Sequence, residues 1–326
     1  MTWLITGGAG YIGSHVVQAL AGSGERAVVL DDLSTGEAAR LPAGVPLERG
    51  SVLDRGLLDR VLREHGVTGV VHIAARKQVG ESVEKPLLYY RENVEGLRTV
   101  LQAAAEAGVS RFLFSSSAAV YGMPETDLVT EATPCLPMSP YGETKLAGEW
   151  LVAAAGRAHG MATVSLRYFN VAGAASPELS DAGVFNLVPM VFERLSEGRP
   201  PLVFGDDYPT PDGTCVRDYI HVEDVADAHV AAVRRLAADP ETSLVLNIGR
   251  GEGVSVTEMI EIIGSVTGLD ARPEVRERRP GDPARVVASA ELIGKELGWS
   301  ARYGVREMVE SAWAGWCARH PETGTG

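Results

Sequence analysis

The sequence has few of the residues that mark secreted, metal-binding or membrane proteins. Its three cysteines, Cys135, Cys215 and Cys317, are too few and too far apart for a disulfide framework or a structural zinc site. The seven histidines show no metal-ligand spacing, so we expect no catalytic metal. No apolar run approaches the roughly 18 residues of a membrane span, and no basic segment of a signal peptide precedes the first apolar run. We therefore expect a cytoplasmic protein.

Positive charge is also scarce. The 30 Lys and Arg residues are outnumbered by 43 Asp and Glu residues, and the formal net charge of −13 would repel nucleic acids and anionic membranes. An anionic small molecule would therefore have to be bound by a few local arginines. Arg217, Arg278 and Arg279 are the candidates, because planar guanidinium groups bind a diphosphate through paired hydrogen bonds. The alternative is that they are ordinary surface arginines.

A glycine-rich turn stands near the start of the chain. Residues 2–6 form a short apolar strand pattern, and Gly7, Gly10 and Gly13 follow directly before a helical pattern. In a dinucleotide-binding turn the first glycine allows the tight turn, the second lets the backbone approach a pyrophosphate, and the third lets the helix pack on the strand. A second apolar run ends at Asp31, whose carboxylate would bind both ribose hydroxyls and repel a 2′-phosphate. The pattern predicts NAD rather than NADP as the ligand. An empty turn of the same shape is the alternative.

Apolar runs and helical patterns alternate through the first half of the chain, which is typical of a parallel sheet covered on both faces. We therefore predict an α/β fold with a Rossmann-type, doubly wound parallel sheet over residues 1–168. The looser second half, residues 169–326, would form a smaller α/β substrate domain, with some segments returning to the first. The expected helices are 54–64, 86–107, 141–159, 223–237, 255–267 and 304–318, and the expected strands are 69–74, 111–115, 162–167 and 244–248.

Side chains with acid–base chemistry follow at the ends of two of these elements. Three serines, residues 115–117, end a predicted strand, where ligands of a parallel sheet bind. Tyr141 and Lys145 lie four residues apart on one face of a helix that Ser139 would cap. An adjacent ammonium group, a helix N-terminus and an oxidised nicotinamide would each favour the phenolate, which would make Tyr141 a general base. A solvated surface pair is the alternative.

Six segments are specific in combination: GGAGYIGSH, HIAARKQVGESVEKPLLYYRENVEG, FSSSAAVYG, SPYGETKLAGE, LRYFN and GTCVRDYIHVEDVADAHV. Together and in this order they resemble the UDP-glucose 4-epimerases, which are extended short-chain dehydrogenases/reductases. The resemblance covers about residues 2 to 318, and the tract from Val79 to Asn93 is more specific than the glycine turn.

The resemblance implies roles residue by residue. It makes Ser117, Tyr141 and Lys145 the catalytic residues. The cofactor-binding residues, including the glycine turn, are Gly7, Gly10, Tyr11, Ile12, Gly13, Asp31, Asp32, Leu33, Ser34, Thr35, Gly36, Ser51, Val52, Ile73, Ala74, Ala75, Lys77, Asn93, Ser115, Tyr141, Lys145, Tyr168 and Phe169. The substrate-binding residues, mostly around UDP, are Lys77, Ser117, Tyr141, Asn170, Asn186, Leu187, Phe204, Arg217, Arg279, Asp282 and Arg285.

Three features depart from the family pattern. Ser51 stands where many relatives place an adenine-contacting aspartate, which puts tight NAD retention in doubt. The loop after Ala174 is short. Arg285 occupies a position near the sugar that is often tyrosine or cysteine in the family, so the range of sugars accepted is in doubt.

These observations predict a redox-neutral 4-epimerase that interconverts UDP-glucose and UDP-galactose through a 4-keto sugar, with NAD as a recycled cofactor. Another UDP-sugar 4-epimerase, acting on N-acetylhexosamines or pentoses, is an alternative. A sugar-nucleotide 4,6-dehydratase is disfavoured, because Ala118 and Ala119 place no carboxylate beside Ser117. A non-catalytic NAD-binding protein could share the fold, but the intact catalytic residues argue against it. The resemblance also implies a homodimer formed by the helices near 86–107 and 141–159.

Overall fold

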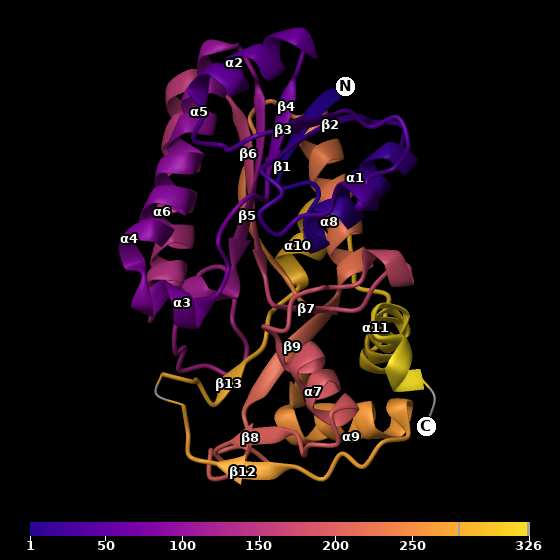
Figure 1. Cartoon of the computed structure of the whole chain (residues 1–326). Coiled ribbons are helices and arrows are strands. Elements are labelled where there is room, and N and C mark those ends of the chain that lie inside the picture. The colour runs from indigo at the N-terminus through magenta and orange to yellow at the C-terminus, as the bar shows by residue number, and fades with distance from the viewer. Residues whose placement is uncertain (280, 325–326) are drawn as a thin grey trace.

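A seven-stranded parallel sheet organises the larger part of the protein, as seen in a computed structural model that describes residues 1–279 and 281–324 (Figure 1). The strand order is β10-β6-β5-β4-β1-β2-β3, so it reverses between β1 and β4, as in doubly wound nucleotide-binding folds. The predicted α/β fold is confirmed. The strands are β1 (Thr2–Thr6), β2 (Arg26–Asp31), β3 (Leu47–Arg49), β4 (Gly69–His72), β5 (Arg111–Ser117), β6 (Ala162–Tyr168) and β10 (Ser243–Ile248).

Helices cover both faces of this sheet, because its central strands carry apolar side chains on both sides (Figure 1). On one face lie α2 (Arg55–Glu64), α5 (Gly96–Glu106) and α6 (Pro140–His159). On the other, α1 (Tyr11–Gly22) packs against α8 (Val222–Ala238), and α10 (Glu291–Leu297) contacts β10. Both β10 and α8 come from beyond residue 168, so the second half of the chain contributes to the first sheet. The boundary at residue 168 stays a prediction.

The helix predicted over 86–107 is broken into pieces. After α3 (Val79–Glu84) come α4 (Pro86–Tyr89), a π-helical turn labelled η2 (Tyr90–Glu95) and then α5. The π turn contains the buried Asn93, whose Oδ1 accepts a hydrogen bond from Arg76 N (2.8 Å) and whose Nδ2 donates to Arg76 O (3.0 Å). Single π turns are frequent at functional sites. The two bonds between Asn93 and Arg76 therefore connect the π turn to the loop that follows β4.

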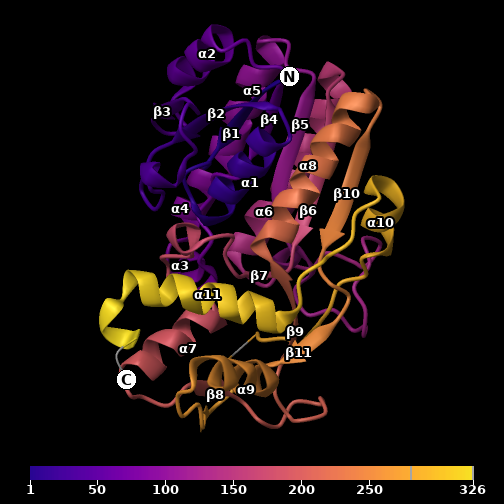
Figure 2. The ribbon, with the colours of Figure 1, turned by 90° about the vertical axis from the view of Figure 1, so that its right-hand side faces the viewer.

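The remaining elements form a smaller α/β region (Figure 2). The helices α7 (Leu187–Ser196), α9 (Val256–Thr267) and α11 (Val305–Arg319) pack against one another around a separate apolar core. Central strand β9 (Val216–His221) pairs with β7 (Asn170–Ala172), β11 (Gly253–Ser255) and β13 (Arg285–Val286), while β8 (Leu202–Phe204) pairs with β12 (Glu274–Arg276). The short turns are η1 (Ala38–Arg40), η3 (Ala118–Tyr121), η4 (Pro177–Leu179) and η5 (Pro321–Gly324).

Among residues 1–279 and 281–324, the structure contains no helix of the length and apolarity that a membrane span requires.

Candidate active site

The glycine turn between β1 and α1 has the shape that its sequence predicts. Gly7 has a φ of +72°, and its N–H donates to Leu30 O (2.9 Å). A Cβ on Gly7 would lie 2.7 Å from Ala74 N, and one on Gly13 would lie 2.0 Å from Gly7 O, so neither position can carry a side chain. Gly10 is the N-cap of α1 and has no side chain to bond the first N–H groups. Those groups are left for an anion at the positive end of the helix.

Asp31 ends β2 with its carboxylate buried beside this turn. Its Oδ2 accepts a hydrogen bond from Ala9 N (2.9 Å), and its Oδ1 accepts one from Leu33 N (2.8 Å). Leu33 has a φ of +59°, which is the only positive value among the described non-glycine residues. Burial raises the pKa of Asp31, and the two N–H groups act against that rise. Each carboxylate oxygen keeps a free lone pair, so Asp31 and the turn fit an adenosine ribose and a pyrophosphate.

Other predicted cofactor residues lie around the same edge of the sheet. The N–H groups of Ile73 and Ala74 both donate to Thr6 O, at 3.1 and 3.0 Å. A Cβ on Gly36 would lie 2.9 Å from Asp31 Oδ1, so the 31–36 loop folds closely over the carboxylate. The Ser51 hydroxyl accepts a hydrogen bond from Leu53 N (3.1 Å) and thereby turns its own loop. The predicted adenosine residues are thus gathered by local turns.

Ser117, Tyr141 and Lys145 come together at the carboxyl end of β5. Ser139 caps α6 by accepting a hydrogen bond from Gly142 N (3.2 Å), as predicted. Lys145 Nζ donates to Ser115 O (2.7 Å) and lies 5.9 Å from the centroid of the Tyr141 ring. The helix spacing therefore does bring the ammonium group beside the phenol.

The pKa values of this group are set mainly by burial. Burial lowers the pKa of Lys145 to about 8, and the charge of Glu149 opposes that shift. Burial raises the pKa of Tyr141, and its hydrogen bond with Ser117 acts in the opposite direction. In the protein alone, loss of hydration therefore outweighs the local polar contacts, and the phenolate in the presence of an oxidised nicotinamide stays a prediction.

Tyr168 closes the site from behind. Its hydroxyl lies 2.7 Å from Ser115 Oγ and 2.6 Å from His229 Nε2. His229 Nδ1 lies 2.8 Å from Val225 O, so Nδ1 carries the ring proton. Nε2 therefore accepts a hydrogen bond. These contacts give Ser115, Tyr168 and His229 hydrogen-bond partners within the protein.

A pocket between the two parts of the protein is lined by Tyr11 of α1 and by residues of β7, α7 and α11. It contains the predicted substrate residues Asn170, Asn186 and Leu187. Asp181, which the sequence pattern does not single out, also lines it. Asp181 Oδ2 lies 3.7 Å from Lys77 Nζ and 3.5 Å from Asn186 Nδ2. One carboxylate thus joins a cofactor-side lysine to the substrate-side loop.

The other predicted substrate residues form a second group. The Arg279 guanidinium lies 3.7 Å from the centroid of the Phe204 ring, and Arg217 Nη2 lies 3.5 Å from Asp282 Oδ1. Asp282 N donates to Arg279 O (3.3 Å), which ties the two pairs together. The group suits a planar base stacked near bound phosphates.

Strand register connects the pocket to this second group. Asn170 on β7 is opposite Tyr219 on β9, and Arg217 lies two residues before Tyr219, about 7 Å along the strand. Arg278, the other arginine named from the sequence, instead donates to Asp207 (2.6 Å) and stacks on Tyr208. Arg278 is therefore engaged on the surface.

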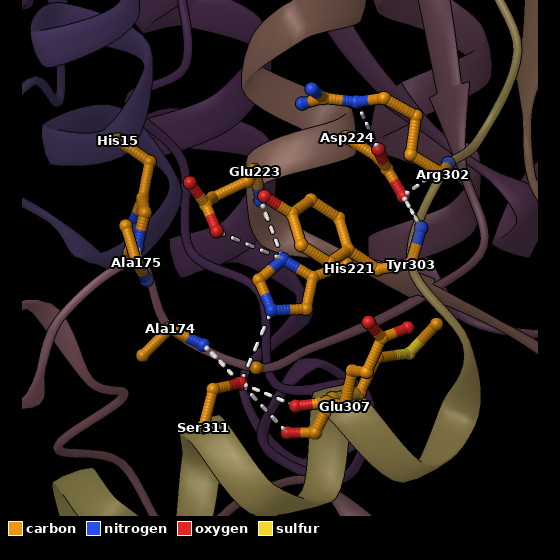
Figure 3. A network of polar contacts seen from close by, with 12 residues as sticks. His15, Ala174, Ala175, His221, Glu223, Asp224, Arg302, Tyr303, Glu307 and Ser311 are labelled. Carbon is orange, nitrogen blue, oxygen red and sulfur yellow. Dashed lines mark hydrogen bonds and ion pairs between the residues drawn. The ribbon is translucent and has the colours of Figure 1, made fainter.

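The segment after β7, residues 173–175, is held from two sides (Figure 3). Ala174 N donates to Ser311 Oγ on α11 (3.2 Å), and Ala175 N donates to His15 Nε2 on α1 (3.1 Å). Tyr11 OH donates to Gly173 O. The helix that carries the glycine turn thus also anchors the start of the loop that lines the pocket.

His221 extends this anchor (Figure 3). Its Nδ1 accepts a hydrogen bond from Glu223 N (3.1 Å), so Nε2 carries the proton and donates to Ser311 Oγ (3.1 Å). His15 Nδ1 donates to Tyr11 O (2.8 Å), which leaves its Nε2 as the acceptor. Both rings are therefore neutral, and burial lowers the pKa of each to about 4.

Comparison with known proteins shows which family has this arrangement. The model of the NAD dependent epimerase/dehydratase family matches residues 3–249. The UDP-glucose 4-epimerase of Azospirillum brasilense is 47% identical over 309 residues, which cover 92% of this chain and 87% of that protein. That of Streptomyces lividans is 44% identical over 323 residues, covering 98% and 97%. The chain belongs to the UDP-glucose 4-epimerase family. The resemblance predicted from the sequence motifs is confirmed.

Solved structures of UDP-glucose 4-epimerases have the same fold throughout. The enzyme from Brucella ovis in complex with NAD superposes with a TM-score of 0.92 at 39% identity, covering 96% of this chain and 98% of that one. The enzyme from Bifidobacterium longum in complex with NAD+ and UDP has a TM-score of 0.91 at 36% identity, covering 99% and 100%. Both parts of the chain therefore match the family, including the region around the pocket.

Some contributors to this epimerase-family site were not predicted from the sequence. Asp181 and Ser311 lie in a loop and a distant helix, and no local pattern connects them to the glycine turn. Glu149 lies four residues after Lys145, so the helical period that revealed Tyr141 and Lys145 could have revealed it too.

Proposed function

We propose that the protein catalyses the NAD-dependent, reversible 4-epimerisation of UDP-glucose and UDP-galactose through a transient 4-keto sugar. The observation that carries this proposal is the position of the Ser117, Tyr141 and Lys145 group, which lies at the carboxyl end of β5, at the same edge of the parallel sheet as the glycine turn and Asp31. The relatives named above are UDP-glucose 4-epimerases, and the named solved structures hold NAD or NAD and UDP.

Ser117, Tyr141 and Lys145 have different roles in removing the proton of the sugar hydroxyl. NAD, when bound, supplies reversible hydride transfer at C4 of the sugar. Tyr141 takes the proton of the 4-hydroxyl group, and Ser117 orients that hydroxyl through its bond to the phenol. Lys145, whose pKa is about 8, is mostly charged at neutral pH and favours the phenolate that burial disfavours.

Inversion requires that the nucleotide stays bound while the sugar turns its other face to the cofactor. Arg217 and Arg279 lie in the second group of substrate residues, away from Tyr141, and would hold the UDP moiety. Ser117 and Tyr141 are the groups that face the sugar, and they offer hydroxyls rather than a charged clamp. Tight binding of the UDP moiety therefore leaves the sugar free to rotate.

The deciding experiment is an assay of the purified protein with UDP-galactose and no added NAD. We expect UDP-glucose to accumulate until the two sugars reach equilibrium. Formation of a 4-keto-6-deoxy sugar would instead show a 4,6-dehydratase, and binding of UDP without conversion of any UDP-sugar would show a non-catalytic protein. The cytoplasmic location stays a prediction.

We expect the protein to purify with NAD bound, because the Gly7 to Gly13 turn and Asp31 bind it tightly and the catalytic cycle never requires NAD to be released. Acid extraction and chromatography would measure the NAD content per chain. Activity that depends wholly on added NAD would contradict tight retention and implicate Ser51. Extraction of NADP would contradict the argument from Asp31.

Arg285 is expected to narrow the range of sugars. Its Nε donates to Asp127 O (3.1 Å), which holds the side chain, while its backbone is opposite Val216 on β9. Because a fixed long side chain near the sugar leaves less room for an acetamido group, Arg285→Ala should raise kcat/KM for UDP-N-acetylgalactosamine relative to UDP-galactose. Differential barriers of this steric kind are about 1 to 3 kcal/mol. An unchanged ratio of the two efficiencies in the alanine variant would show that Arg285 does not select the sugar.

We also infer a homodimer formed through the outer face of α4 and α6. Leu87 on α4 and Trp150 on α6 are 84% and 66% exposed, and the two helices contact each other. Val83 on the neighbouring α3 is exposed as well, so large apolar side chains gather on this face. Helices α3 to α6 run along one side of the molecule in Figure 1.

The double variant Leu87→Glu/Trp150→Glu should therefore be monomeric, because two charges would be buried in the interface. Light scattering after gel filtration would give the mass. Val275→Glu, at a half-exposed apolar residue on β12, is the matched control and should leave the dimer intact. A wild-type protein that is monomeric at micromolar concentration would contradict the proposal directly.

A further inference from the structure

An ion pair lies buried beneath the catalytic residues and has no part in the proton chemistry above. The side chains of Glu149 and Arg167 are 5% and 6% exposed. Arg167 Nε donates to Glu149 Oε1 (2.8 Å), and Nη2 donates to Oε2 (2.6 Å), which makes the pair bidentate. Burying two charges costs several kcal/mol per ion, and well-packed apolar residues often replace such pairs without loss of stability. A gain in stability therefore does not explain why the pair is buried here. Its position suggests another role.

Its position is directly behind the reacting groups. Glu149 follows Tyr141 and Lys145 at the same helical spacing, so all three share the face of α6 that lies on β5. Glu149 Oε1 also accepts a hydrogen bond from Ser116 Oγ (2.5 Å), and Ser116 immediately precedes Ser117. One carboxylate thus connects the helix that carries the base to the strand that carries the catalytic serine.

Arg167 fixes the same carboxylate to the next strand. It lies on β6, where it is opposite Ser116 in the β5–β6 register. Its two bonds to Glu149 restrict rotation of the carboxylate. The arginine therefore holds α6 at a set distance and a set rotation over β5.

The contacts continue from Arg167 toward the substrate region. Arg167 Nη1 donates to Tyr121 OH (2.8 Å), which donates to Asn247 Oδ1 (2.6 Å). Asn247 Nδ2 donates to Val129 O (3.0 Å), and Val129 N donates to Val287 O (2.7 Å). Val287 directly follows β13, the strand on which Arg285 lies. A continuous row of hydrogen bonds thus runs from the catalytic helix to the segment beside the predicted sugar position.

We propose that Glu149 and Arg167 are positioning residues that set the distance between Tyr141 and Ser117, an inference that rests on the epimerase function proposed above. A proton acceptor must lie within hydrogen-bond reach of the hydroxyl that it serves, and a misplacement of about 1 Å can cost up to about 100-fold in rate. Arg217 and Arg279 make their side-chain contacts to Asp282 and Phe204 and not to this pair. Loss of the pair should therefore lower kcat and leave KM nearly unchanged.

The test uses two variants that leave no charge buried alone. Glu149→Met/Arg167→Met replaces both charges with apolar side chains and is expected to keep the fold. Ser116→Ala keeps the ion pair and removes only its link to β5. We expect kcat with UDP-galactose to fall about 10- to 100-fold in the double variant and about tenfold in Ser116→Ala, with KM and NAD content close to wild type. The surface pair Arg60 and Glu64, changed to methionine together, is the matched control and should keep full turnover.

The outcomes separate this inference from the proposed function. A wild-type protein without epimerase activity would overturn the proposed function. With an active wild type, wild-type kcat in Ser116→Ala together with wild-type kcat in a folded double variant would overturn the positioning role. A parallel loss of UDP affinity, NAD content and thermal stability in both variants would also overturn it, because such a loss shows a general structural role. If the double variant does not fold, kcat and KM of Ser116→Ala decide alone.

Discussion

Replacing Tyr141 with phenylalanine is expected to remove most of the turnover and to leave UDP binding nearly intact. The change deletes the phenol that takes the proton of the sugar hydroxyl, and general acid–base groups contribute about 10²- to 10⁴-fold. It removes no contact from the group around Arg217 and Arg279. Steady-state kinetics with UDP-galactose would measure the loss, and calorimetric titration with UDP would show that the binding site is unchanged.

Lys145→Met should lower turnover for a related reason. Its ammonium group lies beside the Tyr141 ring and is held by Ser115 O, so its loss removes the nearby positive charge that favours the phenolate. Tyr90→Phe, which removes a hydroxyl bonded to Glu143 on the outer surface, is the matched control for the tyrosine change. If Tyr141→Phe kept more than about a tenth of the wild-type kcat, Tyr141 would not be the essential base.

The parts of the site that could be predicted from the sequence are those built by neighbouring residues. Gly7 and Gly13 have the conformation and the packing expected of them, because a tight turn and a close helix contact exclude a Cβ wherever they occur. Ser139 caps α6 through a bond to a residue three positions later. Tyr141 and Lys145 meet because a helix brings residues four apart together. Except for the close approach of Gly7 to Ala74, these rules act within one or two turns of chain.

The parts that could not be predicted depend on tertiary contacts. The π turn over Tyr90–Glu95 is explained by Asn93, which bonds the backbone of Arg76 seventeen residues away. Segments of the second half are expected to return to the first sheet, but which strand does so is set by the pairing of β10 with β6, which no pattern in residues 243–248 encodes. Asp181 reaches Lys77 across more than a hundred residues. The raised pKa of Tyr141 in the protein alone has the same origin, because burial is a property of the folded surroundings.

Four buried histidines are expected to make the protein unusually sensitive to mild acid. Burial lowers the pKa of His15, His221 and His229 to about 4 and that of His72 to about 3. In the unfolded chain each histidine would have a pKa of about 6.5. Between these values the unfolded chain binds more protons than the folded one, so stability is fully present above pH 6.5 and is lost as the pH falls toward 4. Protonating His15 or His221 would also put an N–H group against a backbone donor, at Ala175 or Glu223 (Figure 3).

The size of the effect follows from the number of protons. Asp218, whose pKa burial raises to about 6, takes up a proton in the folded state over this range and offsets one of the four histidine protons, which leaves at most about three. Burial also raises the pKa of Asp31, Glu223 and Asp224, which act in the same direction as Asp218. Each proton contributes a slope of up to about 1.4 kcal/mol per pH unit, so the free energy of unfolding should fall by up to about 4 kcal/mol between pH 6 and pH 5. Urea unfolding followed by circular dichroism at pH 7, 6 and 5 would measure this. His72→Gln should reduce the slope by one proton. A stability that stays constant from pH 7 to pH 5 would show that these histidines are not held neutral by the fold.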